Sequence, residues 1–171
     1  EPMELAGRIQ AWRTLYRALG TEQVFADHSP VALIAARTLG LPAVCLGNGF
    51  PVPPRLSPFP SFRASPVGAA HGRDLQRLLL ANEVSVLKEL NHALALLKLK
   101  PFALLQDIFR GAVPALLTYS PLDHYEVPRT EAFRGLPDYS YGAPPRWPEG
   151  RGPKVFAYLT PNPSLPVVLK A

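Results

Sequence analysis

The stretch VFADHSPVALIAARTLGLPAVCL, residues 24–46, decides the fold of this chain. It opens with a short apolar run at 24–26 and closes with another at 43–46, and each has the length and composition of a buried strand. The residues between them predict a helix over 30–39, which Gly40 ends because glycine readily adopts the left-handed conformation of a helix C-cap. A crossover of this length joins parallel neighbours, so the stretch predicts a parallel strand-helix-strand unit.

Three polar residues, Asp27, His28 and Ser29, follow the first of these strands. Ser29 is a favourable helix N-cap, and Pro30 fits the first helical position, where no backbone donor is needed. Ligands of open α/β sheets bind at the carboxyl ends of the strands, so the three residues are candidates for a binding or catalytic site. Asp27 can instead cap the helix that begins at Pro30, and the sequence leaves both roles open.

Composition restricts the class of protein without identifying it. The chain carries a formal charge of +5, but its lysines and arginines are dispersed, so we expect no nucleic-acid partner. The single cysteine, Cys45, lies in a predicted buried strand and provides no disulfide framework, which favours a cytoplasmic location. No apolar run reaches the roughly 18 residues that span a bilayer, and peripheral membrane contact stays open.

Together with the strand-helix-strand unit, the rest of the chain predicts a Rossmann-like α/β domain, in which helices cover both faces of a parallel sheet. We expect further elements as follows: helices over 1–19 and 74–98, a short helix over 101–111, and a buried strand over 113–119. The apolar stripe of the long helix is typical of a core-facing surface. His92 on this helix has only Glu89 at a spacing that could share a metal ion, so we expect no metal site.

The chain is expected to contain parts of two domains. Residues 1–138 form the first, which we expect to be incomplete at its N-terminus because a sheet that opens with a crossover helix needs strands on both sides. Residues 139–152 are rich in proline and resemble an interdomain linker. Residues 153–171 begin a second, truncated Rossmann-like domain with a strand over 154–159 and a helix from Ser164.

A long loop over 47–73 leaves the carboxyl end of the second strand. Its opening Gly47-Asn48-Gly49 invites comparison with a phosphate loop, but Val52 stands where the dinucleotide fingerprint needs glycine, and no Lys-Ser/Thr pair follows. The loop carries three aromatic residues that either form a wall over an apolar ligand or pin the loop to its own domain: Phe50, Phe59 and Phe62.

A second polar cluster, Asp123 and His124, follows the strand predicted over 113–119. An aspartate at a ligand cleft can orient a histidine and stabilise its imidazolium while that histidine removes a proton from a hydroxyl. Asp27 is the best candidate for this role. A pair between Asp27 and the adjacent His28 is disfavoured, because neighbouring side chains that leave a strand point apart.

Four segments resemble, in this order, parts of bacterial sugar-nucleotide glycosyltransferases with the two-domain GT-B fold, those related to macrolide and UDP-glucosyl transferases. They are ADHSPVALIAARTLGLPAVCLGNGFPVPP at 26–54, NEVSVLKELNHALALL at 82–97, ALLTYSPLDHY at 115–125 and GAPPRWPEGRGPKVFAYLTP at 142–161. The resemblance implies a sugar transfer from a nucleotide-diphosphate donor to a hydroxyl of a mostly apolar small-molecule acceptor. It implies no metal or other cofactor.

In that family an aspartate orients the general-base histidine, and Asp27 stands at its position; the histidine itself falls before Glu1. Thr160 is the candidate donor contact, with Thr160-Pro161 standing where many relatives carry Gly-Ser. We expect the remaining substrate contacts from His28, Ser29, Asn48, Gly49, Phe50, Asp123 and His124. Because the base and the donor site lie outside it, the chain alone should not transfer sugar. The alternative function is a non-catalytic α/β binding or interaction module.

Overall fold

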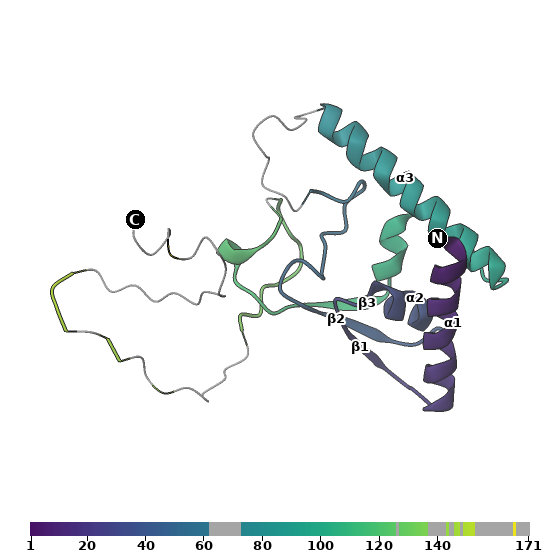
Figure 1. Cartoon of the computed structure of the whole chain (residues 1–171), viewed down its shortest axis with the longest axis horizontal. Helices are drawn as coiled ribbons and strands as arrows, with labels where there is room; N and C mark the ends of the chain where they lie inside the picture. Colours follow the sequence, from purple (N-terminus) through teal and green to yellow (C-terminus); the bar gives the residue numbers. More distant parts are fainter. Residues whose placement is uncertain are drawn as a thin grey trace. The chain divides into compact units, whose positions relative to one another are not determined.

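The computed structural model describes residues 1–61, 73–125, 127–136, 143, 146–147, 149–152 and 166. The chain divides into two units, residues 1–137 and 138–171, and the helices and strands named below all belong to the first (Figure 1). The strand predicted over 154–159 and the donor contact predicted at Thr160 lie outside the described residues. The second domain therefore stays a prediction.

Three parallel strands form the sheet in the order β1-β2-β3, and they are β1 at Val24–Asp27, β2 at Ala43–Gly47 and β3 at Ala112–Leu116. The register pairs Phe25 with Val44 and Val44 with Val113. The parallel pairing of β1 with β2 confirms the predicted strand-helix-strand unit.

The third strand is shorter than the predicted strand over 113–119. Leu117 still donates its N–H to the carbonyl of Gly47, at 2.8 Å, but β2 ends at Gly47 and offers no further partner. The chain then turns through a short 3₁₀ helix, η2 at Ser120–Leu122. The apolar run over 113–119 therefore predicts the end of β3 wrongly, because the length of the neighbouring β2 determines where β3 ends.

The α-helices begin and end within two residues of their predicted bounds: α1 at Pro2–Ala18, α2 at Pro30–Thr38 and α3 at Arg73–Leu96. Gly40 has a φ of +72° and ends α2 in the predicted left-handed conformation. Ser29 occupies the N-cap position of α2, but its side chain makes no capping hydrogen bond. The short helix predicted over 101–111 is a 3₁₀ helix, η1 at Leu105–Phe109.

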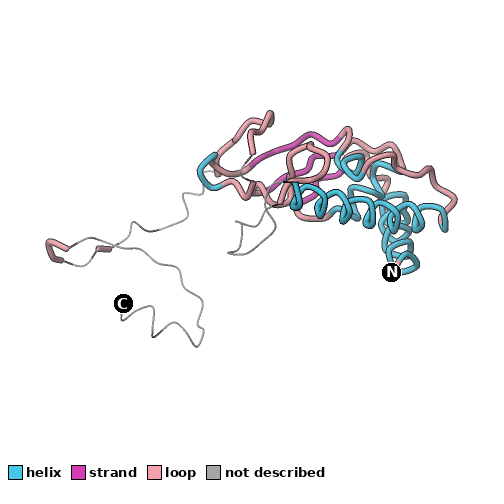
Figure 2. The backbone as a smooth tube through the Cα atoms, turned by 90° about the horizontal axis from the view of Figure 1, so that it is seen from above, coloured by secondary structure: helices cyan, strands magenta, loops and turns pink. Residues whose placement is uncertain are grey.

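The helices α1, α2 and α3 lie on one side of the sheet (Figure 2). Val24, Ala26 and Cys45 are buried on the helical side, whereas Phe25 and Val113, which face the other way, are 66% and 61% exposed. The prediction of helices on both faces is thus wrong for the described residues. Two right-handed crossovers that advance in the same direction along a sheet place their helices on the same face.

The core lies between the sheet and the helices, where α2 packs on β1 and β2 while α1 packs on α2 and α3. Ile9, Leu90 and Leu94 are among its largest fully buried side chains. The hydroxyl of Tyr16 donates to the carbonyl oxygen of Ala32 at 3.3 Å and so ties α1 to α2. This packing holds β1 and the turn after it in place.

A buried carboxylate fixes the loop after β2 to α3. Glu83 accepts hydrogen bonds from the Ser57 hydroxyl at 2.9 Å, from the Phe59 N–H at 2.8 Å and from the Gln106 amide at 2.8 Å. The ring of Phe59 also meets the ring of Phe109 edge-on, with centroids 6.0 Å apart. Phe59 therefore pins the loop to its own domain, which was one of the two interpretations of the loop aromatics.

Replacing Glu83 by Ala is expected to lower the free energy of unfolding by about 1–3 kcal/mol, because the partly buried N–H groups of Phe59 and Gln106 lose an acceptor. Glu83→Gln should lower the free energy of unfolding by less, since its amide oxygen still accepts hydrogen bonds. Urea unfolding measures both changes, with Glu89→Ala, an exposed position of the same helix, as the control. A loss no larger than that of the control would show that the hydrogen bonds to Glu83 contribute little.

Candidate functional site

Residues from all three strand ends meet at the carboxyl edge of the sheet. The ring centroid of Phe50 lies 4.9 Å from that of His28 and 6.0 Å from that of His124, with the rings tilted against one another. His28 follows β1, Phe50 follows β2 and His124 follows β3. The structure thus brings together the two predicted polar clusters, with an aromatic side chain between them.

The turn from β1 into α2 is conformationally unusual at His28, whose φ is +47°. Residues other than glycine seldom adopt this left-handed conformation, and where they do they are concentrated at functional sites. The preceding Asp27 ends β1 with an exposed side chain. Among the described residues its carboxylate accepts no hydrogen bond, either from a histidine or from the start of α2. The interpretation of Asp27 as a helix cap therefore has no hydrogen bond to support it.

The two glycines of Gly47-Asn48-Gly49 allow the loop to approach the other strand ends closely. A Cβ atom on Gly47 would stand 2.4 Å from Cγ of Pro51 and 3.0 Å from Oδ1 of Asp27. A Cβ atom on Gly49 would stand 2.3 Å from Oδ1 of Asp123. Such separations are too short for carbon atoms, so both positions require glycine for close packing. Asn48 between them is exposed.

Arg129 joins the loop after β2 to the segment after β3. Its guanidinium donates from Nε and Nη2 to the two carboxylate oxygens of Asp123, with Nη2 and Oδ1 2.8 Å apart. It also donates to the carbonyl oxygens of Val52 at 2.6 Å and Gly49 at 3.2 Å, and lies 5.1 Å from the ring centroid of Tyr125. The side chains of Arg129 and Asp123 are 1% and 7% exposed. Arg129 is thus the centre of a buried polar cluster.

The environment of Asp123 keeps its carboxyl group ionised. Burial by itself raises the pKa of Asp123, but the hydrogen bond and charge of Arg129, together with the backbone N–H groups of Tyr125 and His124, outweigh burial and lower that pKa. Both oxygens are occupied by the guanidinium. In this arrangement Asp123, through Arg129, holds the loop that carries Phe50, and the substrate contact expected at Asp123 stays a prediction.

A cavity of about 550 Å³ lies beside the turn after β1, between that turn and α1. Its apolar wall comes from Trp12 and Leu15 of α1 and from Val31 of α2. His28, Ser29 and Arg8 contribute polar atoms to its lining. A mostly apolar cavity with a few polar groups is typical of a small-molecule site.

Other kinds of site find no support in the described part of the chain. It contains no group of three or more His, Cys, Asp or Glu side chains that could hold a metal ion. Burial and the charge of Asp27 raise the pKa of Cys45 to about 11 despite an opposing effect of Arg55, so its thiol is no nucleophile at neutral pH. No described helix is both long and apolar enough to cross a membrane.

Comparisons with protein-family models, curated proteins and solved structures find no match to this chain.

Two residues of the site were not predicted from the sequence. Arg129 stands in an irregular segment, where no periodic pattern marks it as buried. Trp12 belongs to the apolar spacing of the first helix, which does not distinguish a cavity wall from the core; it is 36% exposed and lines the cavity. Both roles depend on contacts between distant parts of the chain.

Proposed function

We propose that this chain is the acceptor-binding part of a sugar-nucleotide glycosyltransferase, which moves a sugar from a nucleotide-diphosphate donor to a hydroxyl of a mostly apolar small molecule. The main support is the meeting of His28, Phe50 and His124 at the carboxyl edge of a parallel sheet, next to the exposed Asp27. The cavity walled by Trp12 supports an acceptor with an apolar body.

The proposed chemistry assigns Asp27 to the stabilisation of a general-base imidazole. As the imidazole takes the proton of the acceptor hydroxyl, the carboxylate of Asp27 stabilises the imidazolium that forms. The acceptor oxygen then attacks the anomeric carbon of the sugar, and the nucleoside diphosphate leaves with the electrons of the broken bond. The resemblance to the family puts the base on a histidine outside this sequence. Phe50 is proposed as a wall of the acceptor site, and Asp123 as the residue that positions the loop of Phe50.

The test is sugar transfer by the intact enzyme, followed with a radiolabelled nucleotide sugar and a dihydroxynaphthalene acceptor. We expect transfer by the intact enzyme and none by residues 1–171 alone, although these residues should bind the acceptor. Transfer by residues 1–171 alone would mean that the catalytic groups are misassigned. Failure of the intact enzyme to transfer any of a panel of nucleotide sugars would contradict the proposed reaction.

The alternative function is a non-catalytic α/β binding module. Its support is the cavity itself, because a mostly apolar cavity with a few polar groups can bind a small molecule without any catalytic group beside it. A binding module would bind the acceptor with the same cavity and transfer nothing in the intact protein. Acceptor binding without transfer is therefore the result that separates the two functions.

Replacing Phe50 by Ala is expected to weaken acceptor binding about tenfold, because the acceptor loses an aromatic wall and the two imidazoles lose the ring between them. Isothermal titration with dihydroxynaphthalene measures the change. Phe25→Ala is the matched control, since Phe25 is 66% exposed on the open face of the sheet. Equal affinities of the two variants would remove Phe50 from the proposed site.

A further inference from the structure

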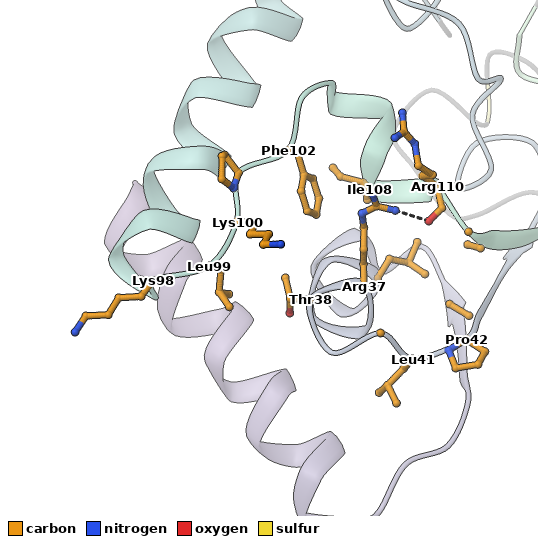
Figure 3. Close-up of a pocket in the computed structure, with 16 residues that line it drawn as sticks. Arg37, Thr38, Leu41, Pro42, Lys98, Leu99, Lys100, Phe102, Ile108 and Arg110 are labelled. Atoms are coloured by element: carbon orange, nitrogen blue, oxygen red, sulfur yellow. Dashed lines mark hydrogen bonds between the residues drawn. The ribbon is translucent and has the colours of Figure 1, made fainter.

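A cavity of about 890 Å³ lies at the opposite edge of the sheet, where β2 and β3 begin (Figure 3). The last turn of α2, the segment after α3 and the residues just before β3 form its walls. Its volume is within the range of small-molecule sites. This cavity is separate from the strand ends to which the transferase function is assigned.

The lining of this cavity contains four basic residues and no aspartate or glutamate: Arg37, Lys98, Lys100 and Arg110. Arg110 is neutralised by Asp107, since its Nη2 lies 2.8 Å from the carboxylate Oδ1. Figure 3 shows that Lys98 extends away from the cavity, whereas Lys100 extends into it between Phe102 and Thr38. Arg37 and Lys100 are therefore the two cations that a bound molecule would meet.

The guanidinium of Arg37 is held in place before any ligand arrives. Its Nη1 donates to the carbonyl oxygen of Arg110 at 2.7 Å, and it lies 5.1 Å from the ring centroid of Phe102. Its other N–H groups have no hydrogen-bond partner among the described residues. A guanidinium fixed in this way presents free donors in a planar fork that matches a phosphate or carboxylate, with less side-chain entropy left to lose.

Helix ends explain only part of this positive charge. The C-termini of α2 and α3 border the cavity, and each carries the equivalent of roughly half a negative charge, which favours nearby cations. Together they balance about one of the basic side chains. Lys98 and Lys100 form no ion pair with any described residue. The cavity therefore carries more positive charge than the two helix ends balance, and an anionic ligand would neutralise the excess.

We propose that this cavity binds a small organic phosphate. The guanidinium of Arg37 and the ammonium of Lys100 hold the phosphate group, which Arg and Lys recognise by charge-assisted hydrogen bonds. The organic part lies against the half-buried side chains of Leu41 and Leu99, which also line the cavity. This site does not depend on the proposed transferase function.

Benzyl phosphate is the probe, titrated calorimetrically into the full chain at low ionic strength. We expect saturable binding to one site, weakened at least fivefold by Lys100→Gln and changed less than twofold by Lys98→Gln. Lys98→Gln is the matched control because it removes the same charge from a side chain that extends away from the cavity. Benzyl alcohol should not bind at this site, and inorganic phosphate should bind more weakly than benzyl phosphate.

Four results would overturn the proposal. They are absence of saturable binding, equal weakening by Lys98→Gln and Lys100→Gln, benzyl alcohol binding that Lys100→Gln weakens, and equal affinities for inorganic phosphate and benzyl phosphate. Equal weakening would assign the binding to diffuse surface charge, and equal affinities would show that the apolar wall takes no part. Lys100 is exposed, so melting curves of the two variants should coincide with that of the native protein.

Discussion

An Asp27→Asn variant of the proposed enzyme is expected to lose about 10²- to 10⁴-fold in kcat, the upper figure being that of the corresponding change in a serine-protease triad. Asp27 ends β1 with an exposed carboxylate that accepts no hydrogen bond from the described residues, so it is available to an imidazole. Asparagine keeps the shape of the side chain and removes the charge that stabilises the imidazolium. Steady-state kinetics measure the loss, and a melting curve should show an unchanged fold.

Asp74→Asn is the matched control for this variant. Asp74 carries an exposed carboxylate in the first turn of α3, so the same change there should leave kcat unaltered. A structural role for Asp27 predicts a different outcome, because asparagine caps a helix about as well as aspartate. An unchanged kcat with an unchanged melting curve would therefore make Asp27 a structural residue and contradict its catalytic role.

The local part of the fold was predictable because its determinants are close in the sequence. The apolar runs at 24–26 and 43–46, with the helix-ending Gly40 between them, specify the crossover unit with little help from distant residues. The covering of only one sheet face follows from the direction in which two successive crossovers advance. That direction depends on where β3 pairs, and no short stretch of sequence encodes it.

The candidate site was predictable only as far as strand ends can be recognised. His28 and His124 were expected at the same edge, and the structure brings each of them to the ring of Phe50. The buried ion pair of Asp123 with Arg129 was not predictable. Arg129 also donates to the carbonyl of Gly49, which lies 80 residues earlier in the chain. Hydrogen bonds over such separations leave no periodic pattern in the sequence.

Replacing Arg129 by Met is expected to lower the free energy of unfolding by about 3–5 kcal/mol, the usual effect of removing one member of a buried ion pair. The variant leaves the carboxylate of Asp123, which is 7% exposed, without its counter-charge. The carbonyl oxygens of Val52 and Gly49 lose their donor as well. Urea unfolding at pH 7 measures the loss, with the exposed Arg134→Met as the control.

Two further variants separate the ion pair from the packing of the side chain. Arg129→Lys keeps the charge but cannot form the bidentate contact with Asp123. Its free energy of unfolding should therefore lie between that of the native protein and that of Arg129→Met. The double variant with Asp123→Leu removes the unpaired charge and should be more stable than Arg129→Met alone. A double variant less stable than Arg129→Met would show that the Asp123 carboxylate stabilises the fold even without Arg129, through its hydrogen bonds from the backbone N–H groups of His124 and Tyr125.

The pH dependence of the unfolding free energy gives the most direct test of the buried ion pair between Asp123 and Arg129. In the native protein the pKa of Asp123 is lowered, so its contribution to stability is present above the ordinary aspartate pKa of about 3.9 and is lost as the pH falls through the folded-state value. Without Arg129, burial should raise that pKa, and the variant should instead lose stability as the pH rises through it. The difference in unfolding free energy between the native protein and Arg129→Met should therefore be largest near pH 7 and shrink towards pH 3. A difference that is independent of pH would show that the charge of Asp123 has no part in the effect.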